Sequence, residues 1–171
     1  MLLQGRLAGG ERRKQAMLQT TLCYLDIGGK TLMLHRVKKK NDVNHDKWIG
    51  IGGKFEHGES PEECMLREFK EETGLTLKVW SYRGIVTFVS DSWCEYMHLF
   101  TATQIEGNMR ECDEGTLEWV NWERITDLPI WEGDKVFLRL LKEREAFFSL
   151  KLVYDGETLV RAALDGQEMK I

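Results

Sequence analysis

The sequence predicts a single α/β domain over residues 17–171, and three observations support this fold class. Segments with strand-like alternation surround two segments whose apolar residues recur at helical spacing. The chain of 171 residues is long enough to bury roughly 68–70% of its unfolded surface without disulfides. The composition, 42% hydrophobic and 30% charged, is that of a globular protein, and no repeat or low-complexity run marks a second domain.

The first 16 residues differ from the rest, because glycines alternate with arginine and lysine and apolar residues are scattered. We expect residues 1–16 to be a disordered leader. Glu11-Arg12-Arg13 can be encoded by a purine-rich, ribosome-binding sequence just upstream of Met17. Met17 is therefore a candidate for the native start, with the leader a translated upstream extension. A basic arm that grips nucleic acid is the alternative, which the shortness of the segment disfavours.

Strand-like segments occupy most of the remaining chain, and Gly28-Gly29 and Asp155-Gly156 are typical hairpin turns between them. The segments expected to be strands are 18–27, 31–37, 48–55, 75–80, 84–89, 93–104, 117–120, 149–153 and 158–164. A helix is expected over Asp134–Phe147, where Val136, Phe137, Leu140 and Leu141 share one face.

The other helix is specified by its ends. Ser60 is a favourable N-cap, Pro61 suits the first helical position, and Glu63 completes a capping box. Gly74 supplies the left-handed residue that ends the helix. The apolar stripe of this helix consists of Met65, Leu66 and Phe69.

Three carboxylates crowd one face of this helix near its C-terminal end. Glu68, Glu71 and Glu72 stand at i, i+3 and i+4, where the helix dipole favours cations instead. Arg67 can pair with Glu71, which relieves only part of the repulsion. A solvated acidic face is the ordinary meaning of such a run. Oxygen ligands gathered in this way also suit a hard divalent cation, which favours a functional site.

The stretch from Gly53 to Leu75 resembles the Nudix box, a pattern of fixed residues over 23 positions. The fixed positions are filled by Gly53, Glu59, Arg67, Glu68, Phe69, Glu71, Glu72, Gly74 and Leu75. The resemblance implies a mixed central β-sheet sandwiched between helices, with the box as the catalytic loop and helix. It also implies a hydrolase that splits diphosphate linkages in nucleoside diphosphate derivatives with Mg²⁺ or Mn²⁺.

The resemblance assigns roles within the box. Glu68 and Glu72 are the principal metal ligands that it implies, and Glu71 is either a further ligand or the general base. Arg67 is expected to orient a carboxylate through a planar fork contact, and Glu59 to support the loop.

Two further metal-site groups are expected outside the helix. A backbone carbonyl near the metal comes from Gly52 or Gly53, and the sequence does not choose between them. Glu114 lies five residues before Trp119, the offset that separates a metal-site glutamate from a strand tryptophan in the animal MutT homologue. The alternative for Glu114 is a polar residue in an Asp-Glu-Gly turn.

Recognition of a base must come from elsewhere, because the box helix carries nothing suited to it. Trp131 precedes a helix, where it could stack on a nucleobase, and Asp134 could bond the base edge. A tryptophan that caps the core is the alternative. This stretch resembles MutT-type enzymes that hydrolyse 8-oxo-dGTP. Two of their base contacts are missing or moved, because Ile49 replaces an asparagine and Gly133 replaces one of two aspartates.

A basic loop ahead of the box is a second candidate for substrate contact. Its charged residues are His35, Arg36, Lys38, Lys39, Lys40, His45 and Lys47. From this region we take Arg36, Lys39, Trp48 and Lys54 as substrate-binding candidates, with a solvated loop as the alternative.

The net charge and the cysteine positions argue against two classes of function, broad nucleic-acid binding and zinc binding. A net charge of −4 disfavours broad nucleic-acid binding, and four cysteines without a C-x-x-C pair give no support for zinc. We expect a cytoplasmic monomer that forms no stable nucleic acid complex and contacts no membrane. The predicted activity is magnesium-dependent hydrolysis of a nucleoside triphosphate, with 8-oxo-dGTP as the first candidate. The alternatives are ordinary dNTPs, nucleotide sugars, capped RNA ends, or a nucleotide sensor without activity.

Overall fold

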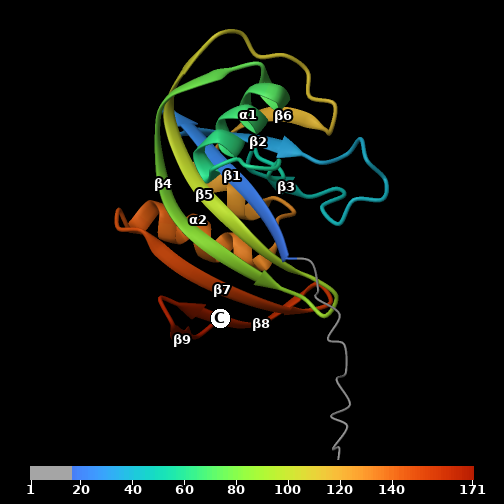
Figure 1. Ribbon diagram of the computed structural model, residues 1–171, viewed down its shortest axis with the longest axis vertical. Helices are drawn as coiled ribbons and strands as arrows, with labels where there is room; N and C mark the ends of the chain where they lie inside the picture. Colours follow the sequence, from blue (N-terminus) through green and yellow to red (C-terminus); the bar gives the residue numbers. More distant parts are fainter. Residues whose placement is uncertain (1–16) are drawn as a thin grey trace, which may run out of the picture.

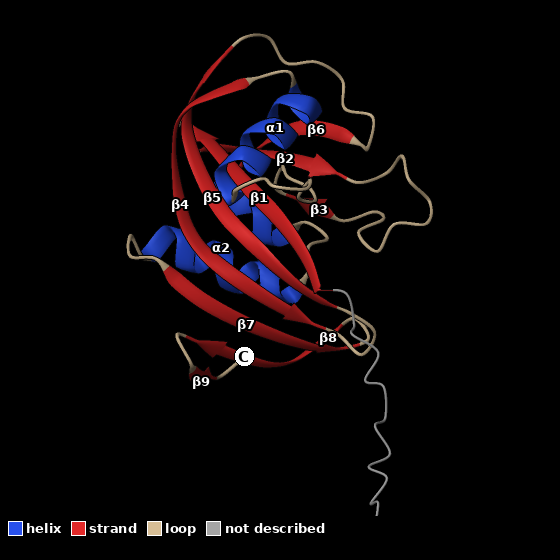
Figure 2. Cartoon of the chain, viewed as in Figure 1, coloured by secondary structure: helices blue, strands red, loops and turns tan. Residues whose placement is uncertain are grey.

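A mixed β-sheet with helices on both faces forms the domain (Figures 1 and 2), which confirms the predicted fold class. The computed structural model describes residues 17–171, so the expectations for residues 1–16 lie outside the described part. Its elements are β1 (Met17–Ile27), β2 (Lys30–His35), β3 (Trp48–Ile49), α1 (Pro61–Thr73), β4 (Thr76–Val89), β5 (Cys94–Glu106), β6 (Thr116–Asn121), the 3₁₀ helix η1 (Trp122–Asp127), α2 (Glu132–Glu143), β7 (Phe148–Asp155), β8 (Thr158–Leu164) and β9 (Gln167–Met169).

The strands lie in the order β3-β2-β1-β5-β4-β7-β8-β9, and β6 pairs with β2 along its whole length. Two pairs, β1 with β5 and β4 with β7, are parallel, and the others are antiparallel. The parallel pairing of β1 and β5 sets Thr20 opposite Met97 and Leu18 opposite Glu95. Residues that are far apart in the sequence therefore meet at the centre of the sheet.

Alternation along the central strands divides the core in two. In β1, Leu22 and Tyr24 belong to the cluster that contains Phe137 of α2. Cys23 and Leu25 belong to the cluster on the other face, which contains Phe69 of α1. Each helix therefore covers one face of the same sheet, as the period-two side-chain pattern requires.

The structure corrects the expected break between residues 80 and 84, because β4 is one continuous strand. Gly84 lies within it, and a Cβ added there would come 2.7 Å from the carbonyl oxygen of Phe148. The glycine therefore permits close approach of β7 rather than a turn.

Two other boundaries also differ from those expected. Helix α2 ends at Glu143 rather than Phe147, because Phe148 opens β7 and is buried against the sheet. The strand expected over residues 48–55 is formed by its first two residues only. Beyond them, Ile51 makes an isolated bridge with Cys23, and Lys54 makes one with Thr20. Within residues 17–171, no helix is long and apolar enough to cross a membrane.

Candidate active site

Helix α1 begins and ends where the sequence places it. The Ser60 hydroxyl accepts a hydrogen bond from the Glu63 amide, and the Glu63 carboxylate accepts one from the Ser60 amide. Gly74 ends the helix with φ of 77°. These local bonds fix the direction in which the last two turns of α1 present their glutamates.

Arg67 braces the loop that precedes α1. Its guanidinium donates to both carboxylate oxygens of Glu59, at 2.5 and 2.9 Å, and to the carbonyl of Lys54 at 3.0 Å. The hydrogen bonds from Arg67 lower the pKa of Glu59 to about 2. The Glu56 amide also donates to Glu59, at 2.8 Å. Glu59 therefore joins the loop to the helix.

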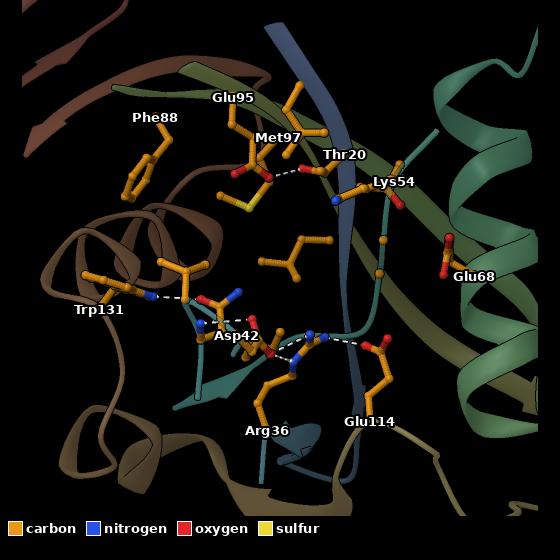
Figure 3. Close-up of a pocket in the computed structure, with 18 of the residues that line it drawn as sticks. Thr20, Arg36, Asp42, Lys54, Glu68, Phe88, Glu95, Met97, Glu114 and Trp131 are labelled. Atoms are coloured by element: carbon orange, nitrogen blue, oxygen red, sulfur yellow. Dashed lines mark hydrogen bonds and ion pairs between the residues drawn. The ribbon is translucent and has the colours of Figure 1, made fainter. Parts of the chain in front are cut away.

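Glu68, Glu72 and Glu114 form the acidic end of a cavity. Glu68 and Glu114 are labelled in Figure 3. Glu72 is 8% exposed, and its Oε2 atom has no hydrogen-bond partner among the described residues. Burial, followed by repulsion from Glu114 and Glu68, raises the pKa of Glu72. A Cβ added to Gly53 would lie 2.4 Å from the Glu68 carboxyl carbon, so the glycine makes room for that side chain.

Two cations of the basic loop are engaged with carboxylates. Arg36 and Lys39 both pair with Glu114, and Arg36 also pairs with Asp42 at 2.6 Å. Arg67 holds Glu68 at 2.8 Å. Within residues 17–171, no three acidic, histidine or cysteine side chains are already gathered closely enough to hold a metal ion.

The chemistry of the acidic end nevertheless fits a divalent cation. Its groups are hard oxygen donors, and the orphaned Oε2 of Glu72 is a buried acceptor that a cation would satisfy. Of the two backbone carbonyls expected here, that of Gly53 accepts the Thr21 amide at 2.9 Å. The Gly52 carbonyl has no hydrogen bond among the described residues, and Gly52 lines the cavity, so we favour Gly52 as the backbone ligand.

The cavity, of about 680 Å³, connects the acidic end to an aromatic end formed by Phe88, Trp93 and Trp131. Lys54 and Asp134 also line it. In Figure 3, Glu68 and Glu114 lie on one side, Phe88 and Trp131 on the other, and Lys54 between them. One cavity therefore brings together most of the residues predicted for metal and substrate.

Trp131 is buried in the core and also lines the cavity, while its stacking on a nucleobase stays a prediction. It is 9% exposed and packs edge-on against Phe88 and Tyr154, with ring centroids 6.1 and 5.6 Å away. Its Nε1 atom donates to Asn44 at 2.8 Å, and the Lys47 ammonium lies 4.5 Å from the ring centroid. The indole is thus part of the core and also a rigid wall of the cavity.

Comparison with known proteins places this geometry in a family. The model of the NUDIX domain matches residues 18–141. The chain belongs to the Nudix family. An uncharacterised Nudix hydrolase of Bacillus subtilis is 29% identical over 161 residues, which cover 89% of this chain and 97% of that protein. The oxidised purine nucleoside triphosphate hydrolase of Danio rerio is 30% identical over 132 residues, which cover 76% of this chain and 85% of that protein.

A solved structure agrees with these relatives. The crystal structure of the mutator MutT protein from Bacillus halodurans is 29% identical, with a TM-score of 0.77, over 88% of this chain and 99% of that one. The chain is therefore a Nudix hydrolase that acts on nucleotide derivatives.

Not every predicted site residue of this Nudix hydrolase lines the cavity. Glu71 is exposed and contacts Arg67 at 3.2 Å. Trp48 is buried in the core and stacks on His35, with ring centroids 4.4 Å apart. The next residue, Ile49, lines the cavity instead. Roles for Glu71 and Trp48 in metal or substrate binding stay predictions.

Several lining residues were not predicted from the sequence. They include Thr20, Asn44, Phe88, Trp93, Glu95 and Met97. A signal existed for Glu95, because it alternates with Met97 and Leu99 on one face of β5, and Leu99 is fully buried. A carboxyl group on an otherwise apolar strand face is unusual enough to mark a site.

Proposed function

We propose that this Nudix hydrolase converts a nucleoside triphosphate into the monophosphate and pyrophosphate with Mg²⁺ or Mn²⁺, and that oxidised purine nucleotides such as 8-oxo-dGTP are its preferred substrates. The observation that carries the proposal is the single cavity that joins the acidic end of the Nudix helix to an aromatic end with a buried carboxyl group. The first suits the phosphates of a nucleotide together with a cation, and the second suits its base.

In this proposal Glu68, Glu72, Glu114 and the carbonyl of Gly52 hold the cation. A divalent cation held there supplies charge neutralisation on the phosphate oxygens and activation of water. Arg67 fixes Glu68 and the Glu59 loop, so the carboxylates keep their positions as a polyanion enters.

The remaining residues bind and orient the nucleotide. Lys54 lines the cavity, and in this proposal it contacts a phosphate (Figure 3). Arg36 and Lys39 pair with Glu114 and line the same cavity, and in this proposal their charge attracts anionic substrate. Trp131 and Phe88 provide flat apolar surfaces for a base.

Pyrophosphate release from a panel of nucleotides with Mg²⁺ tests the proposal. The panel contains 8-oxo-dGTP, dGTP, the other dNTPs, a nucleotide sugar and a capped RNA end. We expect 8-oxo-dGTP to give the highest kcat/KM. A kcat/KM for 8-oxo-dGTP no better than that for dGTP refutes the preference for oxidised purines, and the best member of the panel then identifies the substrate class.

A further inference from the structure

Glu95 is a carboxyl group that the cavity holds in place but that no proposed metal or phosphate role uses. It projects from β5, and the Thr20 hydroxyl of the neighbouring strand β1 donates a hydrogen bond to its Oε1 atom (Figure 3). Burial raises the pKa of Glu95, while Thr20 and the positive charge of Lys54 oppose this effect. Thr20 therefore fixes the carboxyl group at the cavity wall, and Oε2 retains its acceptor capacity.

A second carboxyl group lines the same cavity from a different element. Asp134 belongs to the first turn of α2 and is 6% exposed. Its side chain has no hydrogen-bond partner among the described residues, and the charge of Glu95 contributes to its raised pKa. A buried carboxyl group without a partner is unfavourable unless a ligand provides donors. The aromatic end therefore carries two acceptor groups, on β5 and on α2.

The two groups differ in their charged neighbours. The positive charge of Lys54 lowers the pKa of Glu95, whereas the charge of Lys47, which lies above the Trp131 ring, lowers that of Asp134. In Figure 3, Lys54 lies between Glu95 and Glu68, so Glu95 is on the side of the aromatic end that faces the phosphate-binding end.

The hydrogen-bond groups of purines make this arrangement informative. Guanine has donors at N1 and N2 and an acceptor lone pair at N7, which in the anti conformation lies on the edge nearer the 5′-phosphates. Oxidation at C8 converts N7 into an N–H donor, so 8-oxoguanine carries donors on both edges. A carboxylate attracts an N–H group and repels a lone pair. Two acceptors on separate walls thus suit the oxidised base better than the normal one.

We propose that Glu95 is a specificity-determining residue that accepts a hydrogen bond from N7–H of an oxidised guanine, while Asp134 accepts from the N1 and N2 donors. This inference rests on the proposed function and deepens it. It assigns the discrimination between 8-oxo-dGTP and dGTP to one side chain, outside the Nudix box.

Glu95→Gln is the decisive variant. Glutamine keeps an oxygen for the Thr20 hydroxyl and adds an amide donor that can bond the N7 lone pair of dGTP. We expect the ratio of kcat/KM for 8-oxo-dGTP to that for dGTP to fall about tenfold, the effect of one charge-assisted hydrogen bond. Asp134→Asn is expected to lower kcat/KM for 8-oxo-dGTP and for dGTP to the same extent, because both nucleotides carry the N1 and N2 donors. Glu106→Gln, at the far end of the same strand and outside the cavity, is the matched control and leaves the ratio unchanged.

The wild-type protein provides a test that needs no variant. In 7-deaza-dGTP a C–H group replaces the N7 lone pair, so repulsion by Glu95 is removed. We expect the wild type to hydrolyse 7-deaza-dGTP with a higher kcat/KM than dGTP, and Glu95→Gln to reverse this order.

The outcomes separate the two proposals. If the wild type prefers 8-oxo-dGTP but Glu95→Gln keeps the same ratio, or if 7-deaza-dGTP is no better than dGTP for the wild type, the role of Glu95 is overturned and the proposed function stands. If the wild type shows no preference for 8-oxo-dGTP, the proposed preference for oxidised purines and the role of Glu95 both fail. Thermal unfolding of Glu95→Gln establishes that the measured protein is folded.

Discussion

At the scale of single residues, the buried carboxyl group of Asp134 makes the stability of the folded protein depend on pH. Burial, together with repulsion from Glu95, raises its pKa from 3.8 to about 8. The unfolded chain releases this proton near pH 4, whereas the folded protein keeps it until about pH 8. The contribution of Asp134 to stability is therefore intact at low pH and declines by about 1.4 kcal/mol per pH unit between these values.

Asp134→Asn removes this decline, because asparagine does not titrate. We expect the free energy of unfolding of the variant, relative to wild type, to be higher at pH 8 than at pH 5. Urea unfolding without nucleotide at the two pH values measures the difference. Asp91→Asn, in an exposed loop, serves as the control. If the difference in the free energy of unfolding between Asp134→Asn and wild type is the same at both pH values, burial does not raise the pKa of Asp134 as we argue.

Glu72 is the residue on which we expect activity to depend most. Its carboxylate is buried among Glu68 and Glu114, and glutamine at this position keeps the shape but removes the charge that a cation requires. Glu72→Gln should lower kcat/KM with Mg²⁺ roughly a thousandfold, or about 4 kcal/mol of transition-state stabilisation. Glu62→Gln, on the same helix but outside the cavity, is expected to keep wild-type activity. Near wild-type turnover by folded Glu72→Gln would remove it from the metal site.

At the scale of elements, the end of α1 depends on a glycine that holds a left-handed conformation. Gly74 has φ of 77°, and a Cβ added there would approach the Asn108 carbonyl oxygen to 3.0 Å. Gly74→Ala should lower the free energy of unfolding by about 1–2 kcal/mol from the backbone conformation, with the close contact adding to this loss. Gly156→Ala is the matched control, because Gly156 has φ of 58° with open space around it. Equal losses in urea unfolding would show that the contact at Gly74 has no effect.

The elements also show why some features could be predicted and others could not. The ends of α1 were predicted correctly because Ser60, Glu63 and Gly74 act within one helical turn of each end. The continuity of β4 was missed because Gly84 is explained by Phe148, which lies 64 positions later in the chain and packs against it. A local pattern indicates a turn at such a glycine, whereas the tertiary contact determines the strand.

The candidate site also contains residues that a local motif predicts and contacts that depend on the tertiary structure. The carboxylates of the box follow from one contiguous motif, so Glu68 and Glu72 could be named before their surroundings were known. Glu95 carries a signal in its place among apolar residues of β5, but its contact with Thr20 of β1 depends on the parallel pairing of the two strands and could not be predicted. The basic loop was identified, but its ion pairs with Asp42 and Glu114 depend on how the loop folds back.

At the scale of the whole molecule, the cavity gathers like charges from separate parts of the chain. Glu68 and Glu72 come from α1, Glu114 from the segment before β6, and Glu95 and Asp134 from β5 and α2. Repulsion within each group opposes folding, so the two apolar clusters on either side of the sheet must supply the compensating stability. A ligand that satisfies these carboxylates should therefore stabilise the entire domain.

This coupling gives Glu72→Gln opposite effects on stability with and without metal. Without divalent cations the variant should unfold at a higher temperature than wild type, because it lacks a buried carboxylate with an unpartnered oxygen. With Mg²⁺ at a hundred times its dissociation constant, the wild type should gain about 2.7 kcal/mol, and the variant much less. Thermal unfolding in EDTA and in Mg²⁺ measures both effects, with Glu62→Gln expected to follow the wild type. Equal increases in stability from Mg²⁺ in wild type and Glu72→Gln would place the cation away from Glu72. If Glu72→Gln loses both the stabilisation by Mg²⁺ and the hydrolytic activity, the buried carboxylate that destabilises the metal-free protein belongs to the site that carries out the reaction.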